Sequence, residues 1–330
     1  MTQITKACQR KTRQLLSLVF TFTGNELGRV PMRALSDKDF PALAREVSLE
    51  LENWPGEPSL AVIGEDGILG FKDSGRVYRL ASVTKLLTAL TVLSAADEGV
   101  ISLDDEAGPT GSSLLHLLSH ASGVGFADEQ VRAPAGVRRI YSNTGIDIAA
   151  DYLAGRTGKD FRDEMRIRVL EPLGMHETKL TGPPSKGGEG TITDTARLAR
   201  ELLKPTIFPQ ARIDVLSSLA YPGLGGFLPG FGYHTENDWG AGAEVRGHKS
   251  PHWTSPDNSP STFGHFGMAG SFLWVDREAG LACTALSTIE FGDWAPIAWP
   301  DTSTAVLRAY RKTMQAGMRN SGIRSNSAPR

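Results

Sequence analysis

Ser82 and Lys85 stand three residues apart in the stretch RLASVTKLL, just before an aliphatic run. A serine hydroxyl is a weak nucleophile at neutral pH and needs a neighbouring base. Residues three apart on a helix lie one turn apart on the same face, so the spacing places the amine beside the hydroxyl. Ser82 would lie at the helix N-terminus, where unpaired N–H groups and the dipole favour negative charge. A capping serine followed by a surface lysine fits the same pattern, and this stretch alone does not separate the two.

A second candidate group is Tyr141-Ser142-Asn143, the one Tyr-x-Asn sequence in the chain. A lysine cation nearby stabilises a phenolate, so Tyr141 is a candidate general base. The Asn143 amide offers both an acceptor and a donor, to a lysine and to a substrate amide. The alternative is that the Tyr141 ring packs in the core and Asn143 caps the helix predicted directly after it.

The third group is His265-Phe266-Gly267, the one His-x-Gly sequence, within a strand-like stretch. A glycine at a sheet edge lets a ligand approach the backbone closely. The N–H of Met268 can pair with the N–H of Ser82 to form an oxyanion hole. His265 can bind an acidic group or carry a proton. A strand histidine followed by a bend glycine is the alternative.

These three groups, in this order, resemble the serine β-lactamase and penicillin-binding-protein superfamily. The similar branch contains class C β-lactamases, D-alanyl-D-alanine carboxypeptidases and family VIII esterases. The resemblance extends from about Leu60 to Thr288 and includes LLHLLSHASGV, EPLGMHET, WGAGAEVRG and GHFGMAGSFLWVDREAG. It implies an α+β, β-lactamase/transpeptidase-like fold. In that fold helices flank an antiparallel sheet, an all-helical domain is inserted, and the active site lies in the cleft between them.

The resemblance also implies roles for the candidate residues. Ser82 would be the acylated nucleophile, and Lys85 and Tyr141 would share the role of base without the sequence deciding which takes the proton. Asn143 would orient Lys85 and the substrate amide. The N–H groups of Ser82 and Met268 would form the oxyanion hole. His265 and Gly267 would line the acyl pocket.

One departure from the family pattern concerns the substrate. The family commonly has Lys-Thr-Gly or His-Thr-Gly where this chain has His-Phe-Gly. Phe266 lacks the hydroxyl that would bind a substrate carboxylate, and His265 is mostly neutral near pH 7. We therefore expect an uncharged acyl substrate and an esterase-like hydrolase. The alternatives are a β-lactamase, a D-Ala-D-Ala carboxypeptidase or D-amino-acid amidase, and, in a different class, a noncatalytic ligand-binding protein with this fold.

The composition excludes several other classes of protein. The formal net charge of −2 gives no field that would attract nucleic acid or an anionic membrane. No apolar run is long enough to span a bilayer. The chain has no Gly-x-Ser-x-Gly, P-loop or dinucleotide motif and no metal-ligand spacing, and His116/His120 and His248/His252 fit structural roles better. We expect a small-molecule ester or amide substrate and no cofactor or metal, and the oligomeric state stays open.

The pattern along the chain predicts its organisation. Residues 36–103 and 236–316 form a sheet-plus-helix domain, 104–235 a helical domain, and 1–35 and 317–330 a disordered extension and tail. Helices are expected over 36–54, 82–98 and 302–314, and a hairpin around 65–67.

The N-terminal segment bears on location. Residues 6–24 are basic and then apolar, loosely like a signal peptide, but no small-x-small cleavage site follows. We expect a cytoplasmic protein, with export as the alternative and Met32 as an alternative start to Met1.

Overall fold

A computed structural model describes residues 41–73 and 75–320. Its main element is a six-stranded antiparallel sheet with the strand order β2-β1-β11-β10-β9-β8. The strands are β1 (Ser59–Gly64), β2 (Gly67–Lys72), β8 (Glu244–Val245), β9 (Phe263–Gly267), β10 (Ser271–Asp276) and β11 (Leu281–Leu286). The pairing of β1 with β11 joins the two ends of the described chain in one sheet, and the predicted hairpin around 65–67 is confirmed as β1–β2.

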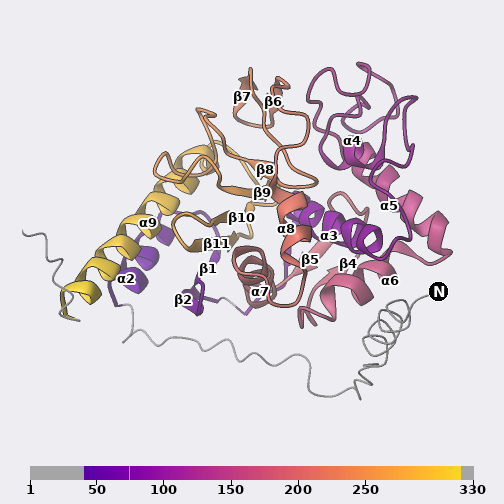
Figure 1. The fold of residues 1–330 in the computed structure, drawn as a ribbon. Helices are drawn as coiled ribbons and strands as arrows, with labels where there is room; N and C mark the ends of the chain where they lie inside the picture. Colours follow the sequence, from indigo (N-terminus) through magenta and orange to yellow (C-terminus); the bar gives the residue numbers. More distant parts are fainter. Residues whose placement is uncertain (1–40, 74, 321–330) are drawn as a thin grey trace, which may run out of the picture. The chain divides into compact units, whose positions relative to one another are not determined.

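Both faces of this sheet are covered, so β1, β10 and β11 are buried at every position, and most of their residues on both faces are apolar. On β10, Phe272 and Trp274 face one hydrophobic cluster, and Leu273 and Val275 face another. The first cluster includes residues of α2 (Pro41–Leu51) and α9 (Ala295–Asn320), which lie side by side in Figure 1. The second includes residues of α3 (Thr84–Asp97) and α7 (Ile192–Leu203).

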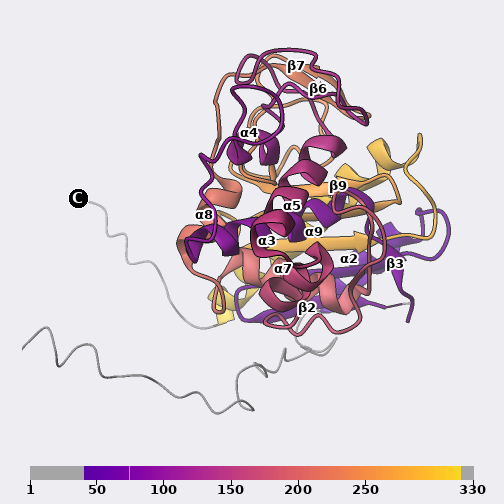
Figure 2. The ribbon, with the colours of Figure 1, turned by 90° about the vertical axis from the view of Figure 1, so that its right-hand side faces the viewer.

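The remaining helices lie mostly beyond one end of the sheet (Figure 2). Around α3 pack α5 (Asn143–Thr157), α6 (Phe161–Met165), the π-helical turn η2 (Arg166–Leu170) and α8 (Gln210–Ser217), and α4 (Leu114–Leu118) packs on α5. Nearly all of α3 is buried, which makes it the central helix of this half of the molecule. The predicted fold, an antiparallel sheet flanked by helices with a helical region beside it, is confirmed.

Segment 104–235 contains more than helices. The short strands β4 (Lys179–Leu180) and β5 (Gly188–Gly190) form a small sheet with β3 (Tyr78–Arg79), and β6 (Gly226–Leu228) pairs with β7 (Gly232–His234). In the same segment, α7 packs on β1, β10 and β11 of the main sheet. The chain therefore crosses between the two halves more often than the composition indicated.

Three helix bounds differ from the sequence expectation. The helix expected over 82–98 begins as a 3₁₀ turn, η1 (Ala81–Val83), and continues as α3. The last helix begins at Ala295, before Pro300, because Trp299 packs among the aromatic rings of the core. It runs to Asn320, into the segment 317–330 that we expected to be disordered. The remainder of that segment, the extension 1–35 and the start expected at Ser36 lie outside the described residues.

Cys283 lies on β11 and is fully buried, and burial raises the pKa of its thiol. This agrees with its interpretation as a small apolar core residue. Among the described helices, none is both long and apolar enough to cross a membrane.

The packing of α3 generates a test of the core. Leu90 on α3 is 0% exposed, whereas Leu49 on α2 is 48% exposed. We expect Leu90→Ala to lower the free energy of unfolding by about 2–5 kcal/mol, because it leaves a cavity between helices. Leu49→Ala should change it by less than about 0.5 kcal/mol. Urea denaturation followed by circular dichroism measures both, and equal effects would contradict this description of the core.

Candidate active site

Ser82 lies on η1, between the end of the small strand β3 and the start of α3. The residue before it, Ala81, has a φ of 44°, a left-handed conformation that costs a non-glycine residue about 1 kcal/mol or more. Leu80 holds this turn in place: its carbonyl accepts from Ser271 Oγ at 2.8 Å, and its N–H donates to the Gly188 carbonyl at 2.8 Å. The hydroxyl of Ser82 is therefore placed by contacts to two sheets.

Lys85 lies one turn further along, and its side chain is fully buried. Its Nζ is 3.0 Å from Ser82 Oγ, 2.7 Å from Asn143 Oδ1 and 2.8 Å from the Ser185 carbonyl oxygen. Burial lowers the pKa of Lys85 to about 7, an effect that the Asp147 carboxylate opposes and the Lys186 cation reinforces. The amine can thus be neutral near physiological pH, with its lone pair available to the serine.

Tyr141 approaches Ser82 from the other side. Its hydroxyl donates to Ser82 Oγ at 2.8 Å, and Lys85 Nζ lies 4.8 Å from its ring centroid. Burial raises the pKa of Tyr141, so its hydroxyl stays protonated at neutral pH. The ring is positioned by packing against His120, with centroids 4.6 Å apart, and Trp239, at 5.7 Å.

Asn143 is the first residue of α5. The helix is capped by Ser142, whose side-chain oxygen accepts from the Gly145 N–H at 2.8 Å. The alternative that Asn143 caps this helix is therefore wrong: the cap is Ser142, and the Asn143 side chain holds Lys85 instead. His120, which we interpreted as structural, accepts from the Ser142 N–H at 3.2 Å.

The end of β9 forms the opposite wall. Gly267 lies so close to η1 that an added Cβ would be 2.5 Å from the Leu80 carbonyl oxygen, so glycine is required there. Of the described residues, none accepts a backbone hydrogen bond from the N–H of Ser82 or of Met268. Both donors are therefore available for an oxyanion, as the sequence led us to expect.

His265 lies on β9 and is buried. Burial, with a further contribution from the Lys85 cation, lowers the pKa of His265 to about 3, so the ring is neutral. Its Nδ1 lies 2.7 Å from the Phe266 carbonyl oxygen, which makes Nδ1 the protonated nitrogen. A neutral ring does not attract an anion, which weakens the role of acid-binding residue that we considered for His265.

Phe266 turns its ring into the core, where it contacts Phe231, Trp253, Phe291 and Trp299 at centroid distances of 5.6–5.8 Å. The position that carries a hydroxyl in the family motif is thus part of the aromatic core. It supplies no side-chain hydrogen bond to a ligand.

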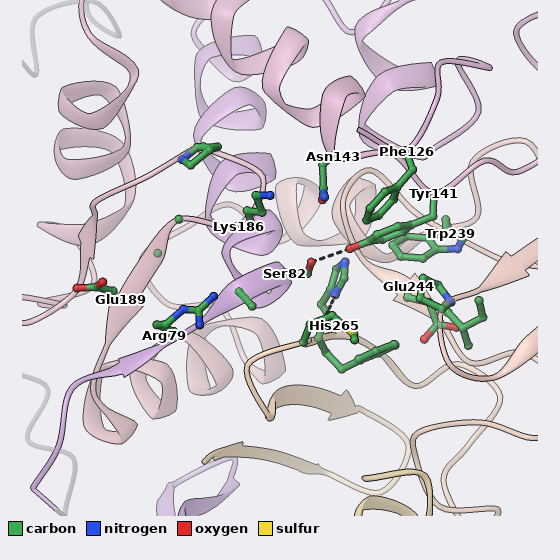
Figure 3. A pocket seen from close by; sticks show the side chains of 18 of the residues that line it. Arg79, Ser82, Phe126, Tyr141, Asn143, Lys186, Glu189, Trp239, Glu244 and His265 are labelled. Atoms are coloured by element: carbon green, nitrogen blue, oxygen red, sulfur yellow. Dashed lines mark hydrogen bonds between the residues drawn. The ribbon is translucent and has the colours of Figure 1, made fainter. Parts of the chain in front are cut away.

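These residues surround one cavity of about 550 Å³ (Figure 3). Ser82 lies near its centre. Tyr141, Phe126, Trp239 and Glu244 lie on one side of it, and Arg79, Lys186 and Glu189 on the other. The structure therefore brings all seven candidate residues together: Ser82, Tyr141, Asn143, His265 and Met268 line the cavity, Lys85 lies beneath it, and Gly267 lies in the β9 wall.

The sequence analysis missed the segment that holds Lys85. Residues 183–187, which we call the strap, contribute the Ser185 carbonyl to Lys85. Asp147, one turn after Asn143 on α5, anchors the strap by accepting from the Ser185 N–H at 2.8 Å and from its hydroxyl at 3.0 Å. The i, i+4 spacing of Asn143 and Asp147 indicates that both side chains lie on the same helix face. The spacing does not indicate which residue each of them contacts.

Glu244 on β8 was also missed. Its carboxylate is buried among three partners. His252 Nε2 lies 3.0 Å from it, Lys249 Nζ lies 2.5 Å from it, and the Trp253 Nε1–H donates to it at 2.8 Å. Burial alone would raise its pKa, but His252 and Lys249 hold the pKa of Glu244 well below its usual range. This pairing gives His252 the structural role that we expected for the second histidine pair.

The chain was compared with known proteins. The family model described as Beta-lactamase matches residues 73–302, more than half of the chain. The chain belongs to the beta-lactamase family. Its membership accounts for the Ser82–Lys85–Tyr141 arrangement in a cleft between sheet and helices.

Three relatives illustrate the range of this family. A crystal structure described as a beta-lactamase, Mb2281c from Mycobacterium bovis, is 43% identical, with a TM-score of 0.78 over 80% of this chain and 99% of that one. EstCE1, described as a hydrolase with promiscuous acyltransferase activity, shares the fold at 16% identity, with a TM-score of 0.68 over 82% and 100% of the two chains. The D-alanyl-D-alanine-carboxypeptidase/endopeptidase AmpH of Escherichia coli K12 is 27% identical over 147 residues, 33% of this chain and only 38% of AmpH.

The charges around Lys85 generate a prediction. Asp147→Asn keeps an acceptor for the strap but removes the negative charge that raises the pKa of Lys85. We expect a neutral Lys85 to activate Ser82, so the reactivity of Ser82 should rise as pH passes the pKa of Lys85. We expect the acid limb of the pH profile to move to lower pH by roughly half a unit to one unit in this variant. The rate at which a fluorophosphonate labels Ser82, measured from pH 5 to 9, gives the pH midpoint of this acid limb.

Asp151→Asn is the matched control, because Asp151 lies one turn further on α5 and is exposed. Its acid limb should stay within about 0.2 units of the wild type. A limb that moves to higher pH in Asp147→Asn, or moves equally in both variants, would contradict the assignment of Lys85 as the titrating group.

Proposed function

We propose that this protein is a serine hydrolase that forms an acyl-enzyme on Ser82 and acts as an esterase on small acyl substrates. The observation that carries the proposal is the pair of short contacts to Ser82 Oγ, from Lys85 Nζ at 3.0 Å and from the Tyr141 hydroxyl at 2.8 Å. A serine that merely capped a helix would need neither group. A noncatalytic binding protein would have no use for a buried lysine beside a serine that lines a cavity.

In this proposal neutral Lys85 removes the Ser82 proton. A neutral amine has two N–H bonds and one lone pair. The N–H bonds go to Asn143 Oδ1 and the Ser185 carbonyl, which aims the lone pair at Ser82 Oγ. The alkoxide adds to the substrate carbonyl, and the oxyanion that forms is held by the N–H groups of Ser82 and Met268.

Tyr141 then delivers a proton to the leaving atom. Its phenol stays protonated and lines the cavity, whereas Lys85 is fully buried beneath it. As the carbonyl re-forms, the bond to the leaving group breaks, the leaving oxygen takes the Tyr141 proton, and Lys85 returns one to Tyr141. In deacylation Tyr141 passes its proton to neutral Lys85 and takes one from water, whose oxygen adds to the acyl carbon. As the bond from the acyl carbon to Ser82 Oγ breaks, Lys85 returns a proton to Ser82 Oγ and the acid is released.

Esterase activity is favoured over the two alternatives by the wall at 265–266. A β-lactam and a peptide C-terminus each carry a carboxylate, and here the neutral His265 and the buried Phe266 ring offer it no cation or hydroxyl. β-Lactamase activity, as named for Mb2281c, and carboxypeptidase activity, as named for AmpH, remain the alternatives that the test below separates.

The first test compares substrates. We expect kcat/KM for p-nitrophenyl butyrate to exceed that for nitrocefin, and for a D-Ala-D-Ala peptide, by about 100-fold or more, since only the latter two need a carboxylate site. Ser82→Ala should lower ester hydrolysis by about 1,000-fold or more and prevent formation of an acyl adduct in mass spectra. Ser261→Ala, in an exposed loop, is the control. Faster turnover of nitrocefin than of the ester would replace esterase by β-lactamase.

The second test concerns Tyr141. Tyr141→Phe keeps the ring and removes the proton donor, so the loss of kcat/KM should depend on the leaving group. We expect a loss of about 100-fold or more for ethyl butyrate, whose alkoxide must be protonated to leave. For p-nitrophenyl butyrate, whose phenolate leaves unprotonated, the loss should be at least tenfold smaller. Equal losses for both esters would show that Tyr141 does not act on the leaving group.

A further inference from the structure

A second hollow adjoins the active-site cavity. It is a groove of about 480 Å³ between the β6–β7 hairpin and the loop that leads to Tyr141, and it shares Phe126, Tyr141 and Pro229 with the cavity. Figures 1 and 2 both show the hairpin beside the loops around α4. The groove is thus a continuation of the active-site cavity along one wall.

The position of the hairpin is fixed at its base. Gly226 forms a bridge with Arg139, and an added Cβ at Gly226 would lie 2.2 Å from the Arg139 carbonyl oxygen. The buried Arg139 guanidinium donates to the carbonyls of Asn237, at 3.0 Å, and Ala220, at 2.8 Å. These contacts tie the loop to the segments on both sides of the hairpin, so the groove is a built feature.

The tip of the hairpin exposes two aromatic rings. Phe227 is 68% exposed and Tyr233 is 59% exposed, and they face each other across the β6–β7 pair with centroids 5.3 Å apart. Phe126, at the junction with the cavity, is 54% exposed. Exposed aromatic residues gathered along one groove are typical of a binding surface.

Three arginines line the groove, and Arg139 among them is buried, with its guanidinium held by carbonyl oxygens. Arg132 pairs with Asp128 at 2.8 Å, and Arg138 donates to the Arg132 carbonyl at 3.0 Å. Of the described residues, no aspartate or glutamate lines the groove. Apart from these arginines, the groove is lined by aromatic rings, Ile140, Pro229 and glycine backbone, which offer contacts to an apolar chain.

The geometry of the reaction says which part of the substrate faces the groove. The leaving atom has to contact the Tyr141 hydroxyl, because that hydroxyl is the proton donor that lines the cavity. The Tyr141 ring stacks on Phe126, with centroids 5.9 Å apart and planes 27° apart. In Figure 3, Phe126 lies beside Tyr141, on the side of Ser82 opposite to Arg79 and Lys186. A leaving group that passes Tyr141 would therefore meet Phe126 next, at the mouth of the groove, and the acyl part would extend the other way.

We propose that the groove between the β6–β7 hairpin and the 126–141 loop binds an extended apolar chain on the leaving-group side of the substrate, so that preferred esters are those of long-chain alcohols. The proposal rests on the proposed function. It names the substrate class of the same site.

The test uses two ester series assayed by acid release. In the first, acetate is fixed and the alcohol grows from butyl to octyl. In the second, ethanol is fixed and the acid grows from butanoate to octanoate. A fully buried methylene contributes about fourfold to binding and one in an open groove about twofold. Octyl acetate has four more methylenes than butyl acetate, so its kcat/KM should be about 16-fold higher. Lengthening the acid should have a smaller effect.

Variants locate the effect. In Phe227→Ser/Tyr233→Ser the octyl-to-butyl acetate ratio should fall to about twofold or less, while the ratio within the acid series keeps its wild-type value. The single variant Phe227→Leu keeps an apolar side chain at 227 and the Tyr233 ring, so it should retain most of the wild-type preference for octyl acetate. Ile297→Ser on α9 is the matched control, since Ile297 is also 68% exposed, and its ratio should equal that of the wild type.

The outcomes separate the two proposals. Equal rates for butyl and octyl acetate in the wild type, or a long-chain preference that survives in Phe227→Ser/Tyr233→Ser, would overturn the groove assignment and leave the esterase standing. The same holds if the double variant flattens the acid series instead, since the acyl chain would then occupy the groove. Turnover of no ester in either series would remove the proposed function and this assignment with it.

Discussion

The nitrogen of Lys85 is held by three oxygens from three separate parts of the chain: Ser82 on η1, Asn143 on α5 and Ser185 in the strap. A buried amine that lost these partners would cost roughly 1–3 kcal/mol or more. The three segments are therefore required to keep their relative positions. Each has its own fixture: Leu80 ties η1 to both sheets, Ser142 caps α5, and Asp147 anchors the strap. The need for hydrogen-bond partners around the buried Lys85 nitrogen thus fixes how η1, α5 and the strap are arranged around the cleft.

Tyr141 depends on a different kind of constraint. Apart from its bond to Ser82, its position is set by ring packing against His120, Trp239 and Phe126. Packing fixes the direction of a phenol without occupying its hydroxyl, which leaves that proton free to move. His120 is in turn fixed by the Ser142 N–H, so the cap of α5 also supports the ring of Tyr141. Polar contacts position Lys85, and apolar contacts position the ring of Tyr141.

Local patterns predicted the parts of the site that lie close in sequence. The three-residue spacing of Ser82 and Lys85 placed both on one helix face, and the uniqueness of the Tyr-x-Asn and His-x-Gly stretches singled out the other walls. Ser185 and Asp147 were not predictable, because a serine in a Gly/Pro-rich loop has no periodicity and its carbonyl matters only through a contact 100 residues away. Phe266 shows the converse: we based a prediction about the substrate on its type, and the structure places its ring in the core, which the sequence did not indicate. The last helix was predicted to begin near Thr302, but it begins at Ala295, and Trp299 in its first turns packs among the aromatic rings of the core.

The left-handed backbone at Ala81 affects both the stability of the fold and the precision with which Ser82 is positioned. A glycine there would adopt the same φ without strain, and the folded chain would lose a local source of tension. It would also widen the conformational range of the adjacent hydroxyl, because a residue without Cβ has more backbone states. At position 81, low backbone strain and a precise position of the Ser82 hydroxyl therefore require different residues. The alanine accepts the strain and keeps the hydroxyl position narrow.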